Sequence, residues 1–271
     1  MKSLGERMKE YERVTRNFLM RKNPVLIRLD GKAFHSFTKG MAKPFDDILI
    51  ETMQETSKML CEEIQCCKLA YTQSDEISLL LVDYETPETE TWFNNNILKM
   101  ASLSASMATL YFNTIFKEKV EIKLVELETE TNSDYISNEE IEKFRKTYLK
   151  KINRALFDSR VWSLPKEDVT NYFIWRQEDA TRNSIQMVGQ ANFSHNQLHK
   201  KSCNMIQEML FAEKEINWND FETYKKRGSC VVKIPKVIND SGLVRMKWEI
   251  DREIPIFKKD REYIDNIVYI K

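Results

Sequence analysis

The sequence contains little glycine and proline and no long hydrophobic run. Its 271 residues include only 6 Gly and 6 Pro, so long disordered linkers are not expected. No stretch reaches the length of about 18 consecutive apolar residues that indicates a membrane-spanning helix, and residues 1–7 lack the apolar core of a secretion signal. We therefore expect a cytoplasmic protein with no membrane partner.

Cysteine spacings typical of metal or redox sites are also missing. The five cysteines are Cys61, Cys66, Cys67, Cys203 and Cys230. Their number is odd, two are adjacent, no Cys-x-x-Cys spacing occurs and no histidine lies nearby. Buried, reduced thiols are therefore favoured over a metal or redox site at the adjacent pair.

Neither sign of charge is in excess. Lys plus Arg and Asp plus Glu each number 42, a balance that neither implies nor excludes nucleic-acid binding, because local patches decide that question. The apolar share of 42% is ordinary for a globular protein. The length is enough for one large domain or two modest ones.

Two aspartates stand where apolar segments end. Asp30 closes one such run and precedes Gly31, and Asp75 lies in a polar turn between the runs 69–71 and 77–82. An ionised carboxylate is costly to bury unless it is paired or binds a metal. If the two segments are neighbouring strands, the carboxylates form a pair suited to Mg²⁺ and nucleotide phosphates.

The hydrophobic periodicity predicts a β-α-β-β-α-β order. This is the ferredoxin-like or polymerase-palm arrangement of the α+β class. In that arrangement the first two strands run parallel with the third between them, so the two aspartates meet at one edge of the sheet. The strands are expected at 25–30, 68–73, 77–83 and 155–162, the helices at 3–19, 46–65 and 88–116, and the charged residues 117–146 show no clear pattern.

The carboxy-terminal part is expected to be mostly helical with a small β-hairpin. We accordingly divide the chain into a palm-like catalytic domain with an amino-terminal helix, 1–163, and a carboxy-terminal helical region, 164–271. Within the second part, helices are predicted at 165–190, 195–211 and 218–227, a hairpin at 230–237 and 243–250 with its turn at 239–242, and a last strand at 263–270.

Each feature of the proposed site also has a plainer interpretation. An Asp-Gly step and a Ser-Asp-Glu turn are most often only turns, and they gain weight because both occur in a palm-like order. His35 is either a base or phosphate contact or a packed loop histidine. Lys43 either neutralises a triphosphate or is a solvated lysine. Glu76 is a supporting acid or a solvated neighbour, and the lesser role is favoured.

Two further groups of residues have the same ambiguity. His195 and His199 have the one-turn spacing of a metal pair, but no third ligand is evident and an exposed helix face is favoured. Two basic clusters offer a surface for RNA phosphates, although clusters of this length are most often solvated. Their members are Lys200, Lys201, Lys225, Lys226 and Arg227.

Several segments together resemble the tRNA-histidine guanylyltransferase superfamily, in the order that the family has and over about residues 20–260. They are residues 28–35 (Arg-Leu-Asp-Gly-Lys-Ala-Phe-His), 42–46 (Ala-Lys-Pro-Phe-Asp), 71–76 (Tyr-Thr-Gln-Ser-Asp-Glu), 175–179 (Trp-Arg-Gln-Glu-Asp) and 224–228 (Tyr-Lys-Lys-Arg-Gly). The resemblance implies a polymerase-like palm, a mostly helical carboxy-terminal region and a homotetramer. It also implies addition of nucleotides in the 3′–5′ direction to the 5′ end of tRNA, after ATP has adenylylated a 5′-monophosphate.

The resemblance implies a role for individual residues. Asp30 and Asp75 would bind two Mg²⁺ ions with help from the Gly31 carbonyl oxygen, and ATP and GTP would be substrates. The backbone N–H groups of residues 31–34 would cradle a triphosphate. The implied catalytic residues are Asp30, Asp75, Lys43 and Ser74, of which the last two would serve activation together with Arg28. The implied nucleotide contacts are Arg28, Gly31, Lys32, Ala33, Phe34, His35, Lys43, Ser74 and Asn183.

One family segment is altered in this sequence. Members that guanylate tRNA-His share the stretch His-Ile-Asn-Asn-Leu-Tyr, whereas residues 181–186 here are Thr-Arg-Asn-Ser-Ile-Gln. Only Asn183 and Ile185 keep the pattern. The missing histidine favours the "like protein" branch of bacteria and archaea, which extends 5′-truncated tRNAs by copying the opposite strand, over guanylate addition to tRNA-His. Arg182 adds a candidate phosphate contact.

Two other functions compete with this one. The same palm and metal ions would serve a nucleotidyl cyclase, which an RNA requirement for turnover would distinguish. A non-catalytic RNA-binding module on a ferredoxin-like sheet would expose aromatic side chains for base stacking. The first and third strands, at 25–29 and 77–82, carry none, which counts against that role.

Overall fold

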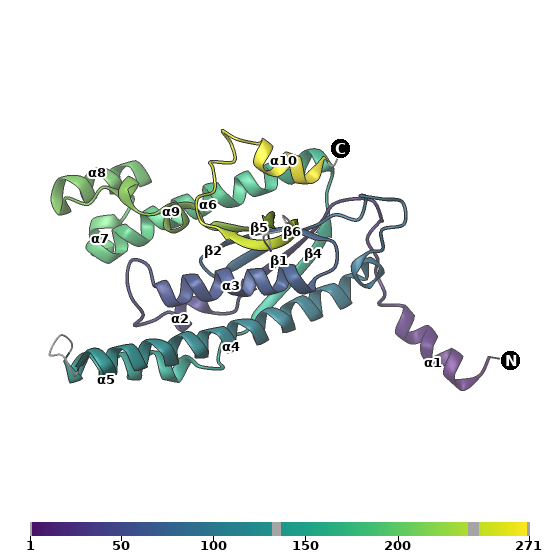
Figure 1. Cartoon of the computed structure of the whole chain (residues 1–271), viewed down its shortest axis with the longest axis horizontal. Coiled ribbons are helices and arrows are strands. Elements are labelled where there is room, and N and C mark those ends of the chain that lie inside the picture. The colour runs from purple at the N-terminus through teal and green to yellow at the C-terminus, as the bar shows by residue number, and fades with distance from the viewer. Residues whose placement is uncertain (1, 132–136, 238–243, 270–271) are drawn as a thin grey trace.

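A six-stranded antiparallel sheet forms the centre of the molecule (Figure 1). The computed structural model describes residues 2–131, 137–237 and 244–269. The strands lie in the order β4 (Phe157–Ser163), β1 (Val25–Gly31), β3 (Glu76–Leu81), β2 (Cys67–Gln73), β5 (Ser229–Val237) and β6 (Val244–Asp251). Because β1 and β2 both pair antiparallel with β3, they run parallel to each other with β3 between them. The palm-like α+β fold is thereby confirmed.

Helices cover both faces of this sheet, which explains why its central strands are mostly apolar. Along β1, Ile27 and Leu29 belong to one hydrophobic core together with Phe112, whereas Leu26 belongs to a second core with Phe173. A strand that is buried on both faces loses the alternation of apolar and polar residues. The covering helices are α3 (Asp47–Glu63) and α4 (Ile97–Thr131) on one face and α6 (Lys166–Asn192) and α10 (Glu262–Val268) on the other (Figure 1).

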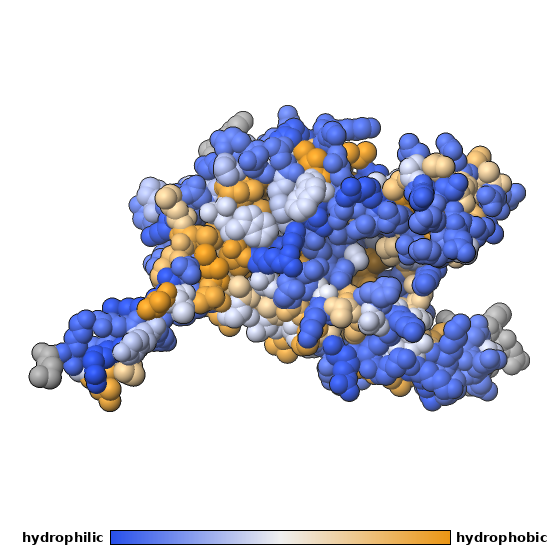
Figure 2. Space-filling view, turned by 180° about the vertical axis from the view of Figure 1, so that it is seen from behind, coloured by the Kyte–Doolittle hydropathy of each residue, from blue (hydrophilic) through white to orange (hydrophobic). Residues whose placement is uncertain are grey.

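The amino-terminal helix α1 (Leu4–Arg13) projects away from the rest of the molecule (Figures 1 and 2). It begins at a capping box between Ser3 and Glu6 and ends before the predicted residue 19. None of its residues is buried, and Tyr11 is 73% exposed. The predicted helix is therefore present, but the apolar face of α1 does not pack on the palm.

Helix α4 is longer than its apolar pattern predicts. It begins after the short 3₁₀ helix η1 (Trp92–Asn95) rather than at residue 88, and it continues to Thr131 through charged sequence. Part of this charge has partners on α3, because Lys119 bridges Glu51 and Glu55 at 2.9 and 2.8 Å. A helix face lined with ion pairs does not show up as hydrophobic periodicity.

The predicted helix 165–190 is present as α6, whereas two other carboxy-terminal helices are divided or shortened. The predicted helix 195–211 is divided into α7 (His195–Leu198) and α8 (Cys203–Lys214), because Lys200 has a left-handed backbone (φ 60°) and Ser202 caps α8. The remaining short elements are α2 (Phe34–Phe37), α5 (Asn138–Tyr148), η2 (Leu149–Lys151), η3 (Trp218–Asp220) and α9 (Thr223–Arg227).

The predicted last strand at 263–270 is wrong, since these residues form α10 up to Val268. Ile264 and Val268 are both fully buried against α6. Residues four apart share a face in a strand as well as in a helix. Their spacing therefore could not separate the two structures.

The predicted hairpin is present as β5 and β6, and its predicted turn, 239–242, lies outside the described residues. The hairpin continues the palm sheet, because Cys230 of β5 lies opposite Tyr71 of β2. The division between residues 163 and 164 stays a prediction. Over the described ranges no helix combines the length and apolar character needed to span a membrane.

Candidate active site

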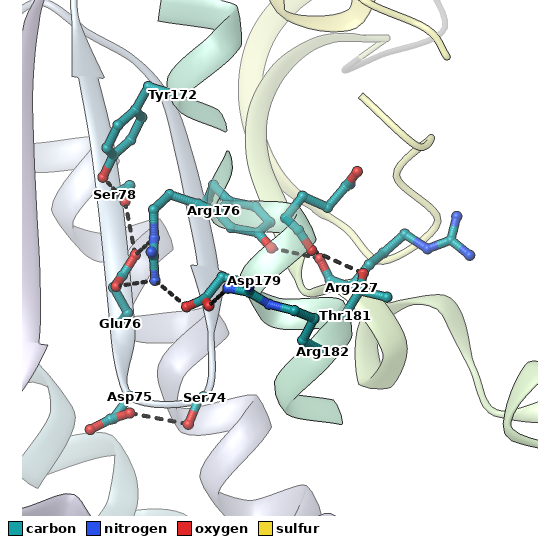
Figure 3. Close-up of polar contacts among 12 residues, drawn as sticks. Ser74, Asp75, Glu76, Ser78, Tyr172, Arg176, Asp179, Thr181, Arg182 and Arg227 are labelled. Atoms are coloured by element: carbon teal, nitrogen blue, oxygen red, sulfur yellow. Dashed lines mark hydrogen bonds and ion pairs between the residues drawn. The ribbon is translucent and has the colours of Figure 1, made fainter. Parts of the chain in front are cut away.

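The sheet brings Asp30 and Asp75 to one edge. Asp30 lies opposite Glu76 in the β1–β3 register, and the backbone N–H of Gly31 donates to the carbonyl oxygen of Asp75 at 3.0 Å. In the turn between β2 and β3, Ser74 has a left-handed backbone (φ 52°) and its hydroxyl donates to Asp75 Oδ1 at 3.1 Å (Figure 3). Strand ends far apart in the sequence thus bring Asp30 and Asp75 close enough for the charge of one to act on the other.

This proximity is unfavourable without a cation. Burial raises the pKa of Asp75, and the negative charge of Asp30 raises it further. Over the described ranges no group of three or more His, Cys, Asp or Glu side chains is arranged to hold a metal ion. The aspartate pair and the Gly31 carbonyl are nevertheless the oxygen donors that Mg²⁺ prefers, and a divalent cation would remove the repulsion between the carboxylates.

Glu76 is held by a buried ion pair, which corrects its interpretation as a solvated neighbour. Arg176 of α6 donates from Nε and Nη2 to the two Glu76 oxygens, each at 2.7 Å (Figure 3). Both residues are less than a tenth exposed. Burial raises the pKa of Glu76, and the hydrogen bonds and charge of Arg176 oppose that shift. Glu76 therefore faces α6 and has its charge matched there.

The ion pair is part of a larger polar network on the α6 side of the sheet. Arg176 Nη2 also donates to Asp179 Oδ2 at 3.0 Å, and Asp179 in turn pairs with Arg182 (Figure 3). The hydroxyls of Ser78 and Tyr172 lie 2.7 Å apart beside Glu76, and burial raises the pKa of the tyrosine to about 12. The network fixes the hairpin that carries Asp75 to the middle of α6.

A cavity of about 680 Å³ opens beside Asp75. Its lining includes Phe34, His35, Lys43 and Ser74, which the family resemblance links to nucleotide binding, together with Asp75, which it links to the metal ions. The His35 and Lys43 side chains are exposed. The buried Phe34 ring packs on Phe37, with 4.8 Å between centroids, and so anchors the loop. Arg28 lies two residues before Asp30 on the same face of β1, opposite Ser78.

Two of the four backbone N–H groups in residues 31–34 that were expected to bind a triphosphate already make hydrogen bonds within the protein. The N–H of Gly31 bonds to Asp75, and that of Lys32 donates to the Leu156 carbonyl at 2.8 Å. The candidate phosphate donors in this loop are therefore the N–H groups of Ala33 and Phe34. Ala33 has a left-handed backbone (φ 56°) at the start of α2, a conformation typical of anion-binding loops.

A smaller cavity of about 70 Å³ connects Ser74 with α6 and α9. Asn183, Lys225 and Lys226 contribute to its lining. Lys225 pairs with Asp47 at 3.1 Å, which raises its pKa against the opposing effect of burial. Burial lowers the pKa of Lys226, and the charge of Arg227 lowers it further. Part of the basic cluster 225–227 is thus built into the fold.

The other predicted RNA contacts lie apart from this cluster. Arg182 is exposed on α6, and Lys200 and Lys201 lie in the turn between α7 and α8 beside His195 and His199. The two histidine rings are 6.2 Å apart between centroids. Their cavity contains no acid or cysteine among the described residues that line it, so the metal-pair interpretation gains no third ligand.

Sequence reasoning missed Arg176 and its partners as parts of the site. The signal was present, because Trp-Arg-Gln-Glu-Asp at 175–179 places an acid three residues after an arginine on a helix. In the folded protein Trp175 stacks over the Arg176 guanidinium, 4.5 Å from the ring centroid. The Gln177 side-chain amide donates to the Pro255 carbonyl oxygen at 2.8 Å and accepts from the Phe257 backbone N–H at 2.9 Å.

Comparison with known proteins agrees with this arrangement. Residues 5–165 match the family of tRNAHis guanylyltransferases. Two solved structures of a bacterial tRNA(His) guanylyltransferase-like protein are similar over 99% of this chain and 100% of theirs: one in complex with ATP (43% identity, TM-score 0.80) and one in complex with GTP (40% identity, TM-score 0.76). The tRNA(His) guanylyltransferase of Debaryomyces hansenii is 27% identical over 249 residues, which are 86% of this chain and 81% of that protein.

The match spans more than half of the chain and includes Asp30 and Asp75 with their loops. The similarity to the bacterial proteins extends over both parts of the molecule. The chain therefore belongs to the tRNA(His) guanylyltransferase family and is a nucleotidyltransferase.

Proposed function

We propose that this enzyme is a template-dependent 3′–5′ nucleotidyltransferase that repairs 5′-truncated tRNA. The observation that carries the proposal is the meeting of Asp30 and Asp75 at the 3.0 Å hydrogen bond from Gly31, beside a cavity that Lys43 and Ser74 line. Thr181, in place of the family histidine, favours repair over guanylate addition to tRNA-His.

Two Mg²⁺ ions would be held by Asp30, Asp75 and the Gly31 carbonyl oxygen. When bound, such a pair offsets phosphate charge and assists the attacking and leaving oxygens of an in-line displacement. The protein's own contribution is geometric. The β1–β3 register and the hydrogen bond from Ser74 hold the carboxylates in place, so little reorganisation is needed when substrate arrives.

The proposed nucleotide addition takes place in two steps. In the first, an oxygen of the tRNA 5′-monophosphate attacks the α-phosphorus of ATP, so that a phosphoanhydride forms and pyrophosphate leaves. In the second, the 3′-hydroxyl of the incoming nucleotide attacks the tRNA 5′-phosphorus, so that a phosphodiester forms and AMP leaves. Both transition states gather negative charge beside Asp75, where Lys43 is placed to offset it.

ATP and GTP are the proposed nucleotide substrates, supported by the bacterial relatives solved with each of them. His35 and Lys43 would face the triphosphate together with the Ala33 and Phe34 N–H groups, and Ser74 would orient Asp75. The full proposed nucleotide set is Arg28, Gly31, Lys32, Ala33, Phe34, His35, Lys43, Ser74 and Asn183.

For RNA, we propose phosphate contacts from exposed and partly exposed cations along α6, α7 and α9. These are Arg182, Lys200, Lys201, Lys225, Lys226 and Arg227. A homotetramer and a cytoplasmic location remain part of the proposal, because the family resemblance implies the first and the sequence the second.

The test uses two 5′-monophosphorylated tRNAs that lack the first nucleotide and differ only in the base opposite the gap. Each is incubated with protein, Mg²⁺, ATP and all four nucleoside triphosphates. We expect products one nucleotide longer whose added base complements the opposite base in both cases. Addition of guanylate regardless of that base would indicate guanylate addition instead. Triphosphate turnover without RNA would indicate a nucleotidyl cyclase, and binding without either product an RNA-binding module.

A further inference from the structure

A second cavity, of about 550 Å³, lies farther along α6, where α7 and α8 pack against its carboxy-terminal end (Figure 1). It is separate from the small cavity beside Ser74, and the mechanism above does not use it. Its lining consists of Gln186, Gln190, Phe193, His195, Leu198, His199, Lys200, Lys201 and Ile206.

Tight packing of α7 and α8 against α6 forms this cavity. A Cβ atom at Gly189 would lie 2.8 Å from Ile206 Cγ2 and 3.4 Å from Leu198 Cδ2. Only glycine therefore lets α7 and α8 approach α6 this closely. The turn is held by backbone hydrogen bonds, since the Lys201 N–H donates to the Leu198 carbonyl at 3.0 Å.

The lining has the chemistry of a nucleotide site. Lys200, Lys201 and the two histidines are exposed donors for phosphate, and the described lining residues include no carboxylate to compete with them. The floor of the cavity is apolar, because Phe193 and Ile206 form it. These two side chains are only 7% and 3% exposed. The amides of the exposed glutamines both donate and accept hydrogen bonds, as contacts to a base edge require.

The cavity adjoins the catalytic one. Gln190 lines both, and Met187, one helical turn before it, lines the cavity of Asp75. The two cavities thus share part of their lining along α6. An RNA strand that passes the reaction centre can therefore place a neighbouring nucleotide here.

We propose that this cavity binds an unpaired nucleotide of the RNA substrate, on the 3′ strand beyond the last base pair. The inference rests on the proposed function: where a 5′ end is extended against a template, the duplex stops at the reaction centre and only the opposite strand continues. Lys200 and Lys201 then hold its phosphates, Gln186 and Gln190 its base edge, and Phe193 and Ile206 its apolar face.

The experiment compares two RNA hairpins with the same duplex, one with a short unpaired 3′ tail and one blunt. Their affinities are measured by fluorescence anisotropy with the full-length protein, the Gln186→Ala variant and the Lys200→Ala/Lys201→Ala double variant. The matched control is Lys143→Ala/Lys146→Ala, which removes two exposed lysines of α5. All side chains changed are exposed, so the fold is retained, as thermal unfolding will confirm.

We expect the affinity for the tailed RNA to fall about tenfold in the double variant, the equivalent of one lost charge-assisted contact. It should fall less in Gln186→Ala, while the blunt RNA changes less than about twofold. Equal losses for both hairpins, or no loss for the tailed one, would overturn the inference. Extension of a recessed 5′ end by the wild-type protein reports on the proposed function separately, so the two can fail independently.

Discussion

Gly31 and Asp75 are joined by a backbone hydrogen bond, with the Gly31 N–H donating to the Asp75 carbonyl oxygen at 3.0 Å. This bond connects the end of β1, which carries Asp30, to the turn between β2 and β3, which carries Asp75. Gly31 also faces the Phe34 ring so closely that a Cβ atom would lie 2.3 Å from Cδ2. The backbone positions of Asp30 and Asp75 and the packing of Phe34 in the following loop therefore depend on one another.

Replacement of Gly31 by alanine should weaken both fold and activity. The added methyl group must push Phe34 out of its packing with Phe37 and Phe112, and overpacking of this kind costs about 1–3 kcal/mol. Urea unfolding measures the loss. Gly5→Ala is the matched control, because nothing lies within 4 Å of a Cβ there, and in the exposed helix α1 it should be neutral or stabilising by at most about 1 kcal/mol. Equal stability of the two variants would contradict the account.

Asp75→Asn should unfold at a higher temperature than the wild-type protein at pH 7 without divalent ions. The folded-state pKa of Asp75 is raised above its ordinary value of 3.8 by burial and by Asp30. Its ionisation therefore destabilises the fold progressively as the pH rises from the ordinary to the raised value. This advantage should shrink as the pH falls and vanish well below the ordinary value of 3.8, where the wild-type carboxyl is protonated in both the folded and the unfolded state; scanning calorimetry at several pH values measures it.

Mg²⁺ should reverse the order of the two unfolding temperatures, so that the wild-type protein becomes more stable than Asp75→Asn. Added Mg²⁺ that binds only the folded state raises the unfolding temperature of the wild-type protein, and Asp75→Asn should show little of this increase. Scanning calorimetry over a range of Mg²⁺ concentrations provides the measurement. An identical Mg²⁺ response in both proteins would remove Asp75 from the metal site.

The buried Glu76–Arg176 pair gives a further prediction about stability. Arg176→Gln leaves Glu76 buried without its charge partner and should cost about 3–5 kcal/mol. The double variant Glu76→Gln/Arg176→Gln removes both charges and should recover much of that loss. As a control, Lys258→Gln breaks an exposed pair with Glu178 and should cost less than about 1 kcal/mol. A cost for Arg176→Gln no greater than for the control would show that the buried pair is not holding the hairpin.

Arg182→Ala tests whether Arg182 contacts a phosphate of the RNA substrate. Arg182 is 61% exposed and pairs only with Asp179 among the ion pairs of the described residues. Loss of one phosphate contact should lower the slope of log affinity against log salt by about 0.9. Arg16→Ala, at an exposed arginine of the amino-terminal segment, should leave the slope unchanged. Unchanged tRNA affinity and turnover in Arg182→Ala would remove this contact.

The palm could be predicted from sequence because its central strands are mostly apolar and because Asp30 and Asp75 stand at or next to the ends of such strands. The segments at 25–31 and 67–73 fixed the order, and the parallel relation of β1 and β2 placed Asp30 beside Asp75. Glu76 shows where this reasoning stops. Its partner Arg176 is 100 residues away, and no local pattern states which helix will cover that face of the sheet.

Other differences between the predicted and the observed structure also have physical reasons. The break between α7 and α8 depends on one left-handed residue, Lys200, a type that rarely marks a turn. The charged extension of α4 is stabilised by partners on α3, such as Glu51 and Glu55. Engagement of the Lys32 N–H by Leu156 comes from strand pairing across the sheet. Each depends on contacts between distant segments, which periodicity cannot show.

The most direct test is the rate of nucleotide addition to a 5′-monophosphorylated tRNA lacking its first nucleotide, measured for the wild-type protein and Asp75→Asn. Asp158→Asn serves as control, because Asp158 lies opposite Asp30 on β4 but is exposed and paired with Arg160 at 3.8 Å. We expect Asp75→Asn to be slower by at least about 100-fold, on the order of 3 kcal/mol of lost transition-state stabilisation, and the control to stay within about threefold. A folded Asp75→Asn protein that extends the tRNA at the wild-type rate would contradict the account.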